Sequence, residues 1–159
     1  MKVIFLDIDG VFNHVSWQKT LTKEQINDLY RTNDAFDPAT VVRFNRVIRE
    51  TGAKIVVSSS WRNLFPEVDE ILKRNGVEGE IIGHTPSKMS LYHRGGEIAL
   101  WLDDTDYPVD TIAIVDDESD MHHLMPYLVQ TTWQNGLQDE HADRLIEMLS
   151  VPNWPSLDR

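Results

Sequence analysis

Short, fully apolar runs alternate along the chain with segments in which apolar residues recur at helical spacing. The first run, VIFL at residues 3–6, has a β-branched bias and suits a strand buried on both faces of a parallel sheet. Comparable runs predict four more strands, over residues 54–57, 80–82, 111–115 and 129–132. The chain therefore offers five candidate strands for one sheet.

The clearest helical pattern follows Asp37. Its apolar residues form one stripe at helical spacing: Val41, Val42, Phe44, Val47 and Ile48. Asp37 suits the N-cap, Pro38 the first helical position, and Gly52 the glycine cap at the C-terminal end. The pattern predicts a helix over residues 38–50, and weaker patterns predict helices within residues 21–30, 65–75, 96–102, 122–128 and 140–149.

Strands that alternate with helices at this spacing are typical of crossover units, in which helices cover both sides of a parallel sheet. We therefore expect an α/β fold, a Rossmann-like doubly wound parallel sheet. The 159 residues suffice for one domain with a sizeable core and are too few for two ordinary domains. A single domain is predicted over residues 1–150, with a short insertion at about residues 13–37 and an irregular tail over 151–159.

The amino-acid composition excludes several kinds of site and disfavours some partners. The chain has no cysteine, which excludes disulfides, thiolate metal sites and cysteine nucleophiles. No apolar run approaches the ~18 residues of a membrane span, and acids follow the short N-terminal run directly, so neither a membrane partner nor a signal peptide is expected. A cytoplasmic location is the simplest match. The net charge of −11 disfavours an extended nucleic-acid surface but permits a local basic pocket for one phosphate group.

Side chains that carry chemistry follow three of the predicted strands. Asp7 and Asp9 come after the first, Ser58 after the second, and Asp116 and Asp117 after the fourth. The carboxyl ends of parallel strands share one edge of the sheet, so these residues should be neighbours. Crowded carboxylates need a counter-ion, and an all-oxygen set favours Mg²⁺ over zinc. Magnesium in turn points to phosphate chemistry.

These motifs resemble those of a known superfamily. DIDGV at residues 7–11 is similar to the first motif of the haloacid dehalogenase (HAD) superfamily, the aspartate-nucleophile phosphatases. Ser58 after KIVV resembles the second motif, Arg94 or Lys88 the third, and IAIVDDESD at residues 112–120 the fourth. The four occur in the family's order over residues 1–120. SSSWR and RGGEIALWL look most like the HAD domains of RNA-repair proteins and, more distantly, the phosphatase domain of polynucleotide kinase-phosphatases.

The resemblance implies a HAD-like fold and a role for each acid. Asp7 would be the nucleophile that forms an aspartyl-phosphate, and Asp9 the general acid–base. The metal set would comprise Asp7, Asp9 through its backbone carbonyl, and Asp116, with Asp117 acting through water. The cofactor implied is Mg²⁺. The insertion is too short for a full cap domain, so we expect little or no cap over the site.

The resemblance also implies which residues bind the substrate phosphate. Ser58 and the backbone N–H of Ser59 would hold the transferring group, with Arg94 or Lys88 as the cation. Arg94 is favoured because it stands immediately before a predicted helix, although Lys88 stays open. Arg62 would either reach a substrate phosphate or pair with a surface acid.

The remaining aromatic residues and histidines have structural interpretations. Trp61, Trp101 and Trp133 lie in or beside apolar segments and are expected in the core. His122 and His123 are adjacent on a predicted helix, so they point in different directions, and no spacing supports zinc. Trp17, in the insertion, would pack there or, as the alternative, stack on a substrate.

The sequence therefore predicts a Mg²⁺-dependent phosphomonoester hydrolase. Its partner would be a phosphorylated small molecule, a nucleotide or a nucleic-acid end. Two alternatives use the same fold: a phospho-acceptor module like a response-regulator receiver, and a catalytically idle HAD scaffold. Receivers carry their acidic pair near the first strand and accept phosphate on a later one, whereas here DxD comes first and DD last.

Overall fold

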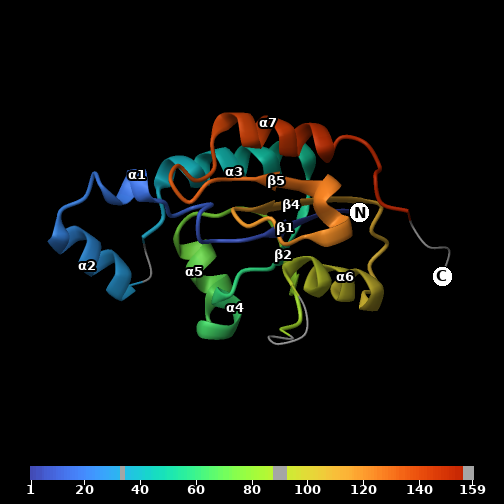
Figure 1. The fold of residues 1–159 in the computed structure, drawn as a ribbon, viewed down its shortest axis with the longest axis horizontal. Coiled ribbons are helices and arrows are strands. Elements are labelled where there is room, and N and C mark those ends of the chain that lie inside the picture. The colour runs from blue at the N-terminus through green and yellow to red at the C-terminus, as the bar shows by residue number, and fades with distance from the viewer. Residues whose placement is uncertain (33–34, 88–92, 156–159) are drawn as a thin grey trace.

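A parallel five-stranded sheet forms the centre of the computed structural model, which describes residues 1–32, 35–87 and 93–155 (Figure 1). Its strands are β1 (Lys2–Leu6), β2 (Lys54–Val57), β3 (Ile81–His84), β4 (Thr111–Asp116) and β5 (Leu128–Gln130). The strand order is β3-β2-β1-β4-β5, and every pairing is parallel. The chain runs outward from β1 to β3 and then crosses to the other side of β1, so the topology switches between β1 and β4. The predicted doubly wound α/β fold is confirmed.

Helices cover both faces of this sheet. They are α1 (Val15–Gln18), α2 (Lys23–Thr32), α3 (Pro38–Thr51), α4 (Trp61–Leu64), α5 (Val68–Arg74), α6 (Arg94–Asp104), the 3₁₀ helix η1 (His122–Tyr127) and α7 (Asp139–Met148). In Figure 1, α3 and α7 lie over one face and α6 lies over the other. The helices α1 and α2 stand at one end of the molecule, on the left of that view.

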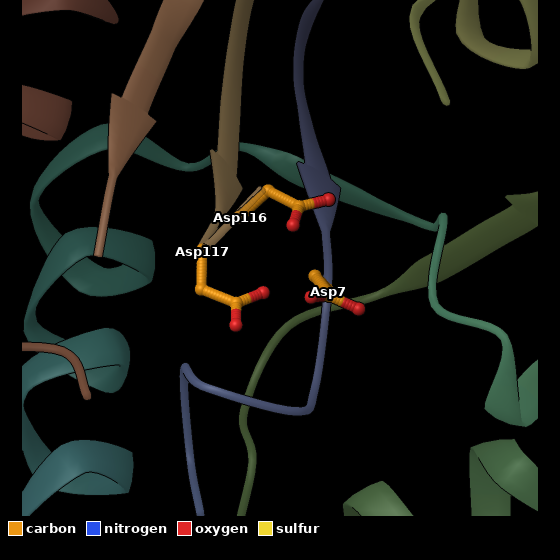
Figure 2. A group of neighbouring side chains, drawn as sticks. All are labelled: Asp7, Asp116 and Asp117. Atoms are coloured by element: carbon orange, nitrogen blue, oxygen red, sulfur yellow. The ribbon is translucent and has the colours of Figure 1, made fainter. Parts of the chain in front are cut away.

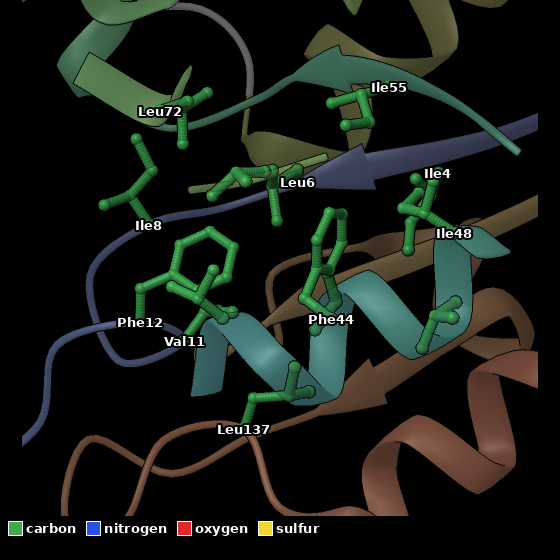
Figure 3. Close-up of a cluster of buried hydrophobic side chains, with 14 of the residues drawn as sticks. Ile4, Leu6, Ile8, Val11, Phe12, Phe44, Ile48, Ile55, Leu72 and Leu137 are labelled. Atoms are coloured by element: carbon green, nitrogen blue, oxygen red, sulfur yellow. The ribbon is translucent and has the colours of Figure 1, made fainter. Parts of the chain in front are cut away.

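Strand β1 buries both of its faces, as the apolar run predicts. Ile4 and Leu6 pack with Phe44 of α3 in one core cluster (Figure 3). Val3 and Phe5 point the other way, into a second cluster with residues of α6 and η1. All five side chains are fully buried. Because side chains alternate along a strand, a single run of four apolar residues supplies both cores.

The capping signals place α3 correctly. The Asp37 carboxylate accepts the Ala39 N–H at 3.0 Å, and Pro38 is the first helical residue. Gly52 ends the helix with φ = 69° and donates its N–H to the Ile48 carbonyl oxygen. A positive φ of this kind favours glycine, which explains why the pattern stops there.

The helix predicted over residues 65–75 begins too early. Phe65 is extended, with φ = −128° and ψ = 103°, because the ring of Pro66 disfavours a helical residue before it. The helix α5 therefore starts at Val68. A separate short helix, α4, occupies residues 61–64 and was not predicted.

Other boundaries shift by one or two residues. Strand β3 starts and ends later than predicted, and its register against β2 shifts between Ile55 and Val56. Strand β5 starts and ends earlier than the predicted segment 129–132. The helix α6 begins at Arg94, two residues before the predicted start. The segment 122–127 is a 3₁₀ helix that contains Pro126, which has no N–H for a helical bond. Among the described residues, no helix is long and apolar enough to cross a membrane.

Candidate active site

Three carboxylates gather where β1 and β4 end, at the topological switch point (Figure 2). Asp7 directly follows β1, and its N–H donates to the Val115 carbonyl oxygen at 3.1 Å. Asp116 is the last residue of β4, and Asp117 follows it. Asp7, Asp116 and Asp117 each offer one oxygen, and these oxygens lie within 4.8 Å of one another. Ligands of doubly wound sheets bind at such a point.

Burial makes this cluster electrostatically unusual. Asp116 is fully buried, and burial together with the nearby charge of Asp7 raises its pKa to about 9. Burial and the same neighbour raise the pKa of Asp117 to about 6. Several close carboxylates in a dry site cannot all stay ionised unless a cation joins them. The donors are all oxygens, which is the ligand set of a hard divalent cation such as Mg²⁺.

Arg94 supplies one positive charge to the cluster. Its Nη1 lies 3.4 Å from Asp7 Oδ1 and 3.3 Å from Asp116 Oδ2. Burial lowers the pKa of Arg94, but the charges of Asp7 and Asp116 outweigh it, so the net shift is upward. One guanidinium beside three acids still leaves a negative excess. The residues present therefore fit a divalent cation.

The first turn of α6 is fixed in place by the loop after β4, and this fixes Arg94. The Arg94 N–H donates to Asp120 Oδ2 at 3.1 Å, and the Gly95 N–H donates to the Asp120 carbonyl oxygen at 3.0 Å. A side chain on Gly95 would collide with the backbone of Met121. Glycine therefore allows the close approach that brings the arginine to the carboxylates.

The Asp9 carboxylate points to partners other than the acidic cluster. Its Oδ1 accepts a hydrogen bond from Asn13 Nδ2 at 2.8 Å, and its Oδ2 accepts one from Trp61 Nε1 at 3.0 Å. Directly after Asp9 the chain turns at Gly10, with φ = 75°, and a side chain on Gly10 would collide with the Asp117 carboxylate. The turn thus needs glycine both for its conformation and for its contact with the cluster.

Ser58 and Ser59 lie beside Asp7, at the end of β2. The Ser58 N–H donates to the Leu6 carbonyl oxygen at 2.9 Å, which continues the β1–β2 pairing into the site. Both serines are fully buried. The Ser58 hydroxyl has no hydrogen-bond partner within the described part of the chain. A buried hydroxyl of this kind is available to a ligand, since such groups are normally satisfied.

Arg62 pairs with a buried acid and not with a surface acid, so that alternative is wrong, while contact with a substrate phosphate stays a prediction. Its Nη2 pairs with Glu97 of α6 at 2.6 Å, and both side chains are buried. Its Nη1 donates to the carbonyl oxygens of Ser58 and Ser59, and its Nε donates to that of Thr85. Burial lowers the pKa of Arg62, against the charge of Glu97, which raises it. Arg62 therefore ties the ends of β2 and β3 to α6.

Several other sequence predictions have a clear outcome. Trp61 is buried, as predicted, but Trp133 is half-exposed, in the turn that follows β5. His122 and His123 are both exposed. Trp17 lies in α1 and is half-buried, which leaves its two interpretations as predictions.

Lys88, the second candidate for the cation of the third motif, lies outside the described residues. Several other residues that contact the site were not predicted. Sequence reasoning missed the roles of Asn13, Trp61, Glu97 and Asp120, which contact site residues from loops, from α4 and from α6. The glycine pair after Arg94 was a usable signal for a close approach at Asp120.

The fold and the site together define an α/β domain with an acidic ligand site at its switch point. The chain belongs to the family described as the HAD domain in Swiss Army Knife RNA repair proteins, which it matches over residues 3–142. This confirms the predicted resemblance to HAD domains of RNA-repair proteins. Comparisons with curated proteins and with solved structures gave no match. Membership of the family supports phosphatase activity of the HAD type on a phosphorylated substrate.

Proposed function

We propose that the chain is a Mg²⁺-dependent phosphomonoester hydrolase that works through an aspartyl-phosphate on Asp7. The observation that carries this proposal is the cluster of Asp7, Asp116 and Asp117 with Arg94 at its side. The cluster offers a nucleophilic carboxylate, an oxygen-only cation site and a positive group within one buried edge of the sheet. A phosphomonoester needs all three for displacement at phosphorus.

The residues that would hold Mg²⁺ are Asp7, Asp116 and Asp117, with the backbone carbonyl of Asp9 completing the protein ligands. When bound, the cation would offset the negative charge of the carboxylates and of the substrate phosphate. The raised pKa of Asp116, caused by burial and by Asp7, supports this assignment, since a bound cation is what would keep these acids ionised.

The first chemical step is displacement of the ester oxygen by Asp7. One oxygen of its carboxylate attacks phosphorus, the bond from phosphorus to the leaving oxygen breaks, and Asp9 donates a proton to that oxygen. The Ser58 hydroxyl and the Ser59 N–H hold the phosphoryl oxygens. Arg94, which lies against Asp7, stabilises the charge that these oxygens carry in the transition state.

The second step regenerates the enzyme. The Asp9 carboxylate accepts a proton from a water molecule, whose oxygen attacks the phosphorus of the acyl phosphate. The bond from phosphorus to the Asp7 oxygen breaks, which releases inorganic phosphate and returns Asp7 as a carboxylate. Each of the two steps has a lower barrier than a single direct hydrolysis.

We propose a nucleotide or nucleic-acid end phosphate as the substrate. The family description, which refers to RNA repair proteins, supports this class. The net charge of −11 argues for contact with the terminal phosphate alone, because an extended acidic surface repels a polyanion. A phosphorylated small molecule is the alternative that the test must separate.

Phosphate release tests the proposal directly. The panel contains small phosphomonoesters and oligonucleotides with 3′ or 5′ phosphates, each with Mg²⁺ and with EDTA. Metal-dependent release from oligonucleotide ends supports the full proposal, and release from small esters alone would restrict it to a general phosphatase. A single phosphorylation of the protein without turnover would indicate a receiver-like module, and no reaction at all would indicate a scaffold.

A further inference from the structure

Asp9 is held by two side chains that no motif of the proposed reaction includes. Asn13 donates to its Oδ1 at 2.8 Å, and Trp61 donates to its Oδ2 at 3.0 Å. Each oxygen of the carboxylate thus has its own N–H donor, which fixes both the position and the rotation of the group.

The donor end of Asn13 is itself fixed. Its Oδ1 accepts the Gly10 N–H at 3.0 Å, and Gly10 also donates to the Asn13 carbonyl oxygen at 3.0 Å. Asn13 is almost fully buried. With its oxygen committed to Gly10, the amide can only present its NH₂ group to Asp9. The turn at Gly10 and the orientation of Asp9 therefore depend on the same side chain.

Trp61 reaches Asp9 from a different part of the chain. It is buried between Phe36 and Phe65, with ring centroids 5.9 Å and 5.1 Å away. Its backbone N–H donates to Ser59 Oγ at 3.2 Å, so the indole is anchored to the segment proposed to bind phosphate. An indole N–H can only donate, so the Asp9 oxygen is the acceptor in this hydrogen bond. The contact joins the end of β1 to the end of β2.

We infer that Trp61 and Asn13 are positioning residues that aim Asp9 at the leaving oxygen. This inference rests on the proposed function, in which Asp9 protonates that oxygen. Loss of the Trp61 N–H lets the carboxylate rotate and weakens proton donation. A leaving group that departs readily as an anion needs little proton donation, whereas an alkoxide needs it fully. We therefore expect loss of this contact to lower the activity mainly on substrates with poor leaving groups.

Trp61→Phe tests this, because it removes the N–H and keeps an aromatic ring. We compare kcat/KM, which reports the first step alone, because Asp9 also serves as the base of the second step for every substrate. For an alkyl phosphate we expect kcat/KM to fall about 10- to 100-fold, a partial loss of the roughly 10²–10⁴-fold that general acid catalysis contributes. For 2,4-dinitrophenyl phosphate we expect kcat/KM to change by less than about threefold. Trp101→Phe is the matched control, since Trp101 also packs edge-on against a phenyl ring, that of Phe5, but in the second core cluster.

A double-mutant cycle separates positioning from general packing. In an Asp9→Ala background there is no carboxylate to aim, so Trp61→Phe should have no further effect on alkyl phosphate turnover. Asn13→Ser, which removes the other donor, should give the same leaving-group dependence. It replaces Trp61→Phe in the double-mutant cycle if Trp61→Phe does not fold. Thermal melting of every variant identifies those that fold.

The outcomes distinguish this inference from the proposed function. If Trp61→Phe lowers kcat/KM equally for both esters, or if its loss persists in the Asp9→Ala background, the positioning role is wrong and the phosphatase assignment stands. A wild-type protein that releases no phosphate from either ester would overturn the proposed function and this inference with it. A selective loss that vanishes beside Asp9→Ala establishes the positioning role.

Discussion

The edge of the sheet that carries the candidate active site has two halves, and they differ in their balance of charge. At the ends of β1 and β4, three carboxylates face one arginine, Arg94. At the ends of β2 and β3, Arg62 faces one carboxylate, Glu97, and uses its remaining contacts on backbone carbonyl oxygens. The first half carries excess negative charge and needs a ligand. In the second half the charges of Arg62 and Glu97 neutralise each other, so this pair serves as a rigid support.

Each half therefore responds differently to the loss of a charge. Removing an acid from the β1–β4 half relieves repulsion between buried carboxylates, whereas removing a partner from the Arg62–Glu97 pair leaves a buried charge uncompensated. Function and stability should thus separate along this edge: substitutions in the acidic half change activity first, and substitutions in the supporting half change folding first.

The largest effect is expected from Asp7→Asn in the acidic half. Turnover should fall by at least about 10³-fold, because an amide cannot form the acyl phosphate. The melting temperature in EDTA should stay equal or rise, because one repelling buried charge is gone. Asp28→Asn, at an exposed acid of α2, is the control and should change neither quantity. Substantial residual turnover in Asp7→Asn would contradict the assigned nucleophile.

Arg62→Met tests the supporting half. The substitution leaves Glu97 buried without its counter-charge, so the free energy of unfolding should fall by about 3–5 kcal/mol. Chemical denaturation measures it. Arg31→Met gives the matched comparison, because Arg31 pairs with Asp28 in water, with side chains 75 % and 58 % exposed. We expect less than about 0.5 kcal/mol there. Equal effects at the two arginines would refute the distinction between a buried support and a surface pair.

Arg94→Met removes the cation of the acidic half. The structure places Arg94, and not a residue of β2 or β3, against Asp7 and Asp116. The loss of one charge-stabilising group from a buried site should lower kcat by roughly 10²-fold. Lys88→Met is the matched substitution at the other candidate, with an expected change below about twofold. The reverse pattern, measured with the same ester, would assign the cation role to Lys88.

The acidic half was predictable from the sequence, because the apolar run directly before each residue shows where that residue lies. Asp7 and Asp116 each follow a short apolar run directly, and a parallel sheet brings such positions to one edge. The run defines the strand, the alternation with helices indicates a parallel sheet, and the two together bring these residues to one edge. No knowledge of a loop conformation is needed at any of these steps.

The supporting half was not predictable, because its contacts depend on loops and on side-chain direction. Arg62 and Glu97 are 35 residues apart, and nothing in their spacing pairs them. Trp61 was correctly expected in the core, but burial of a tryptophan does not say where its N–H points. Trp133 was expected in the core and is half-exposed, because the turn after β5 directs it outward.

The smallest effect expected is a pH dependence of metal affinity. Burial and the charge of Asp7 raise the pKa of Asp116 to about 9 and that of Asp117 to about 6. Below these values the carboxyl groups hold protons that a cation must displace, so Mg²⁺ affinity should rise as the pH increases between about 6 and 9. The rise is at most about tenfold per pH unit for each proton released.

Calorimetry in buffers of different ionisation enthalpy counts these protons. Asp117→Asn should remove the part of the dependence near pH 6 and keep the part at higher pH, because the latter belongs to Asp116. Arg62→Met, if it still folds, should leave the proton count unchanged, since the supporting half holds no metal ligand. An affinity that does not vary with pH would mean that the acidic half is already ionised without a cation, and the contrast between the two halves would then lie in their hydrogen bonds and not in their charge.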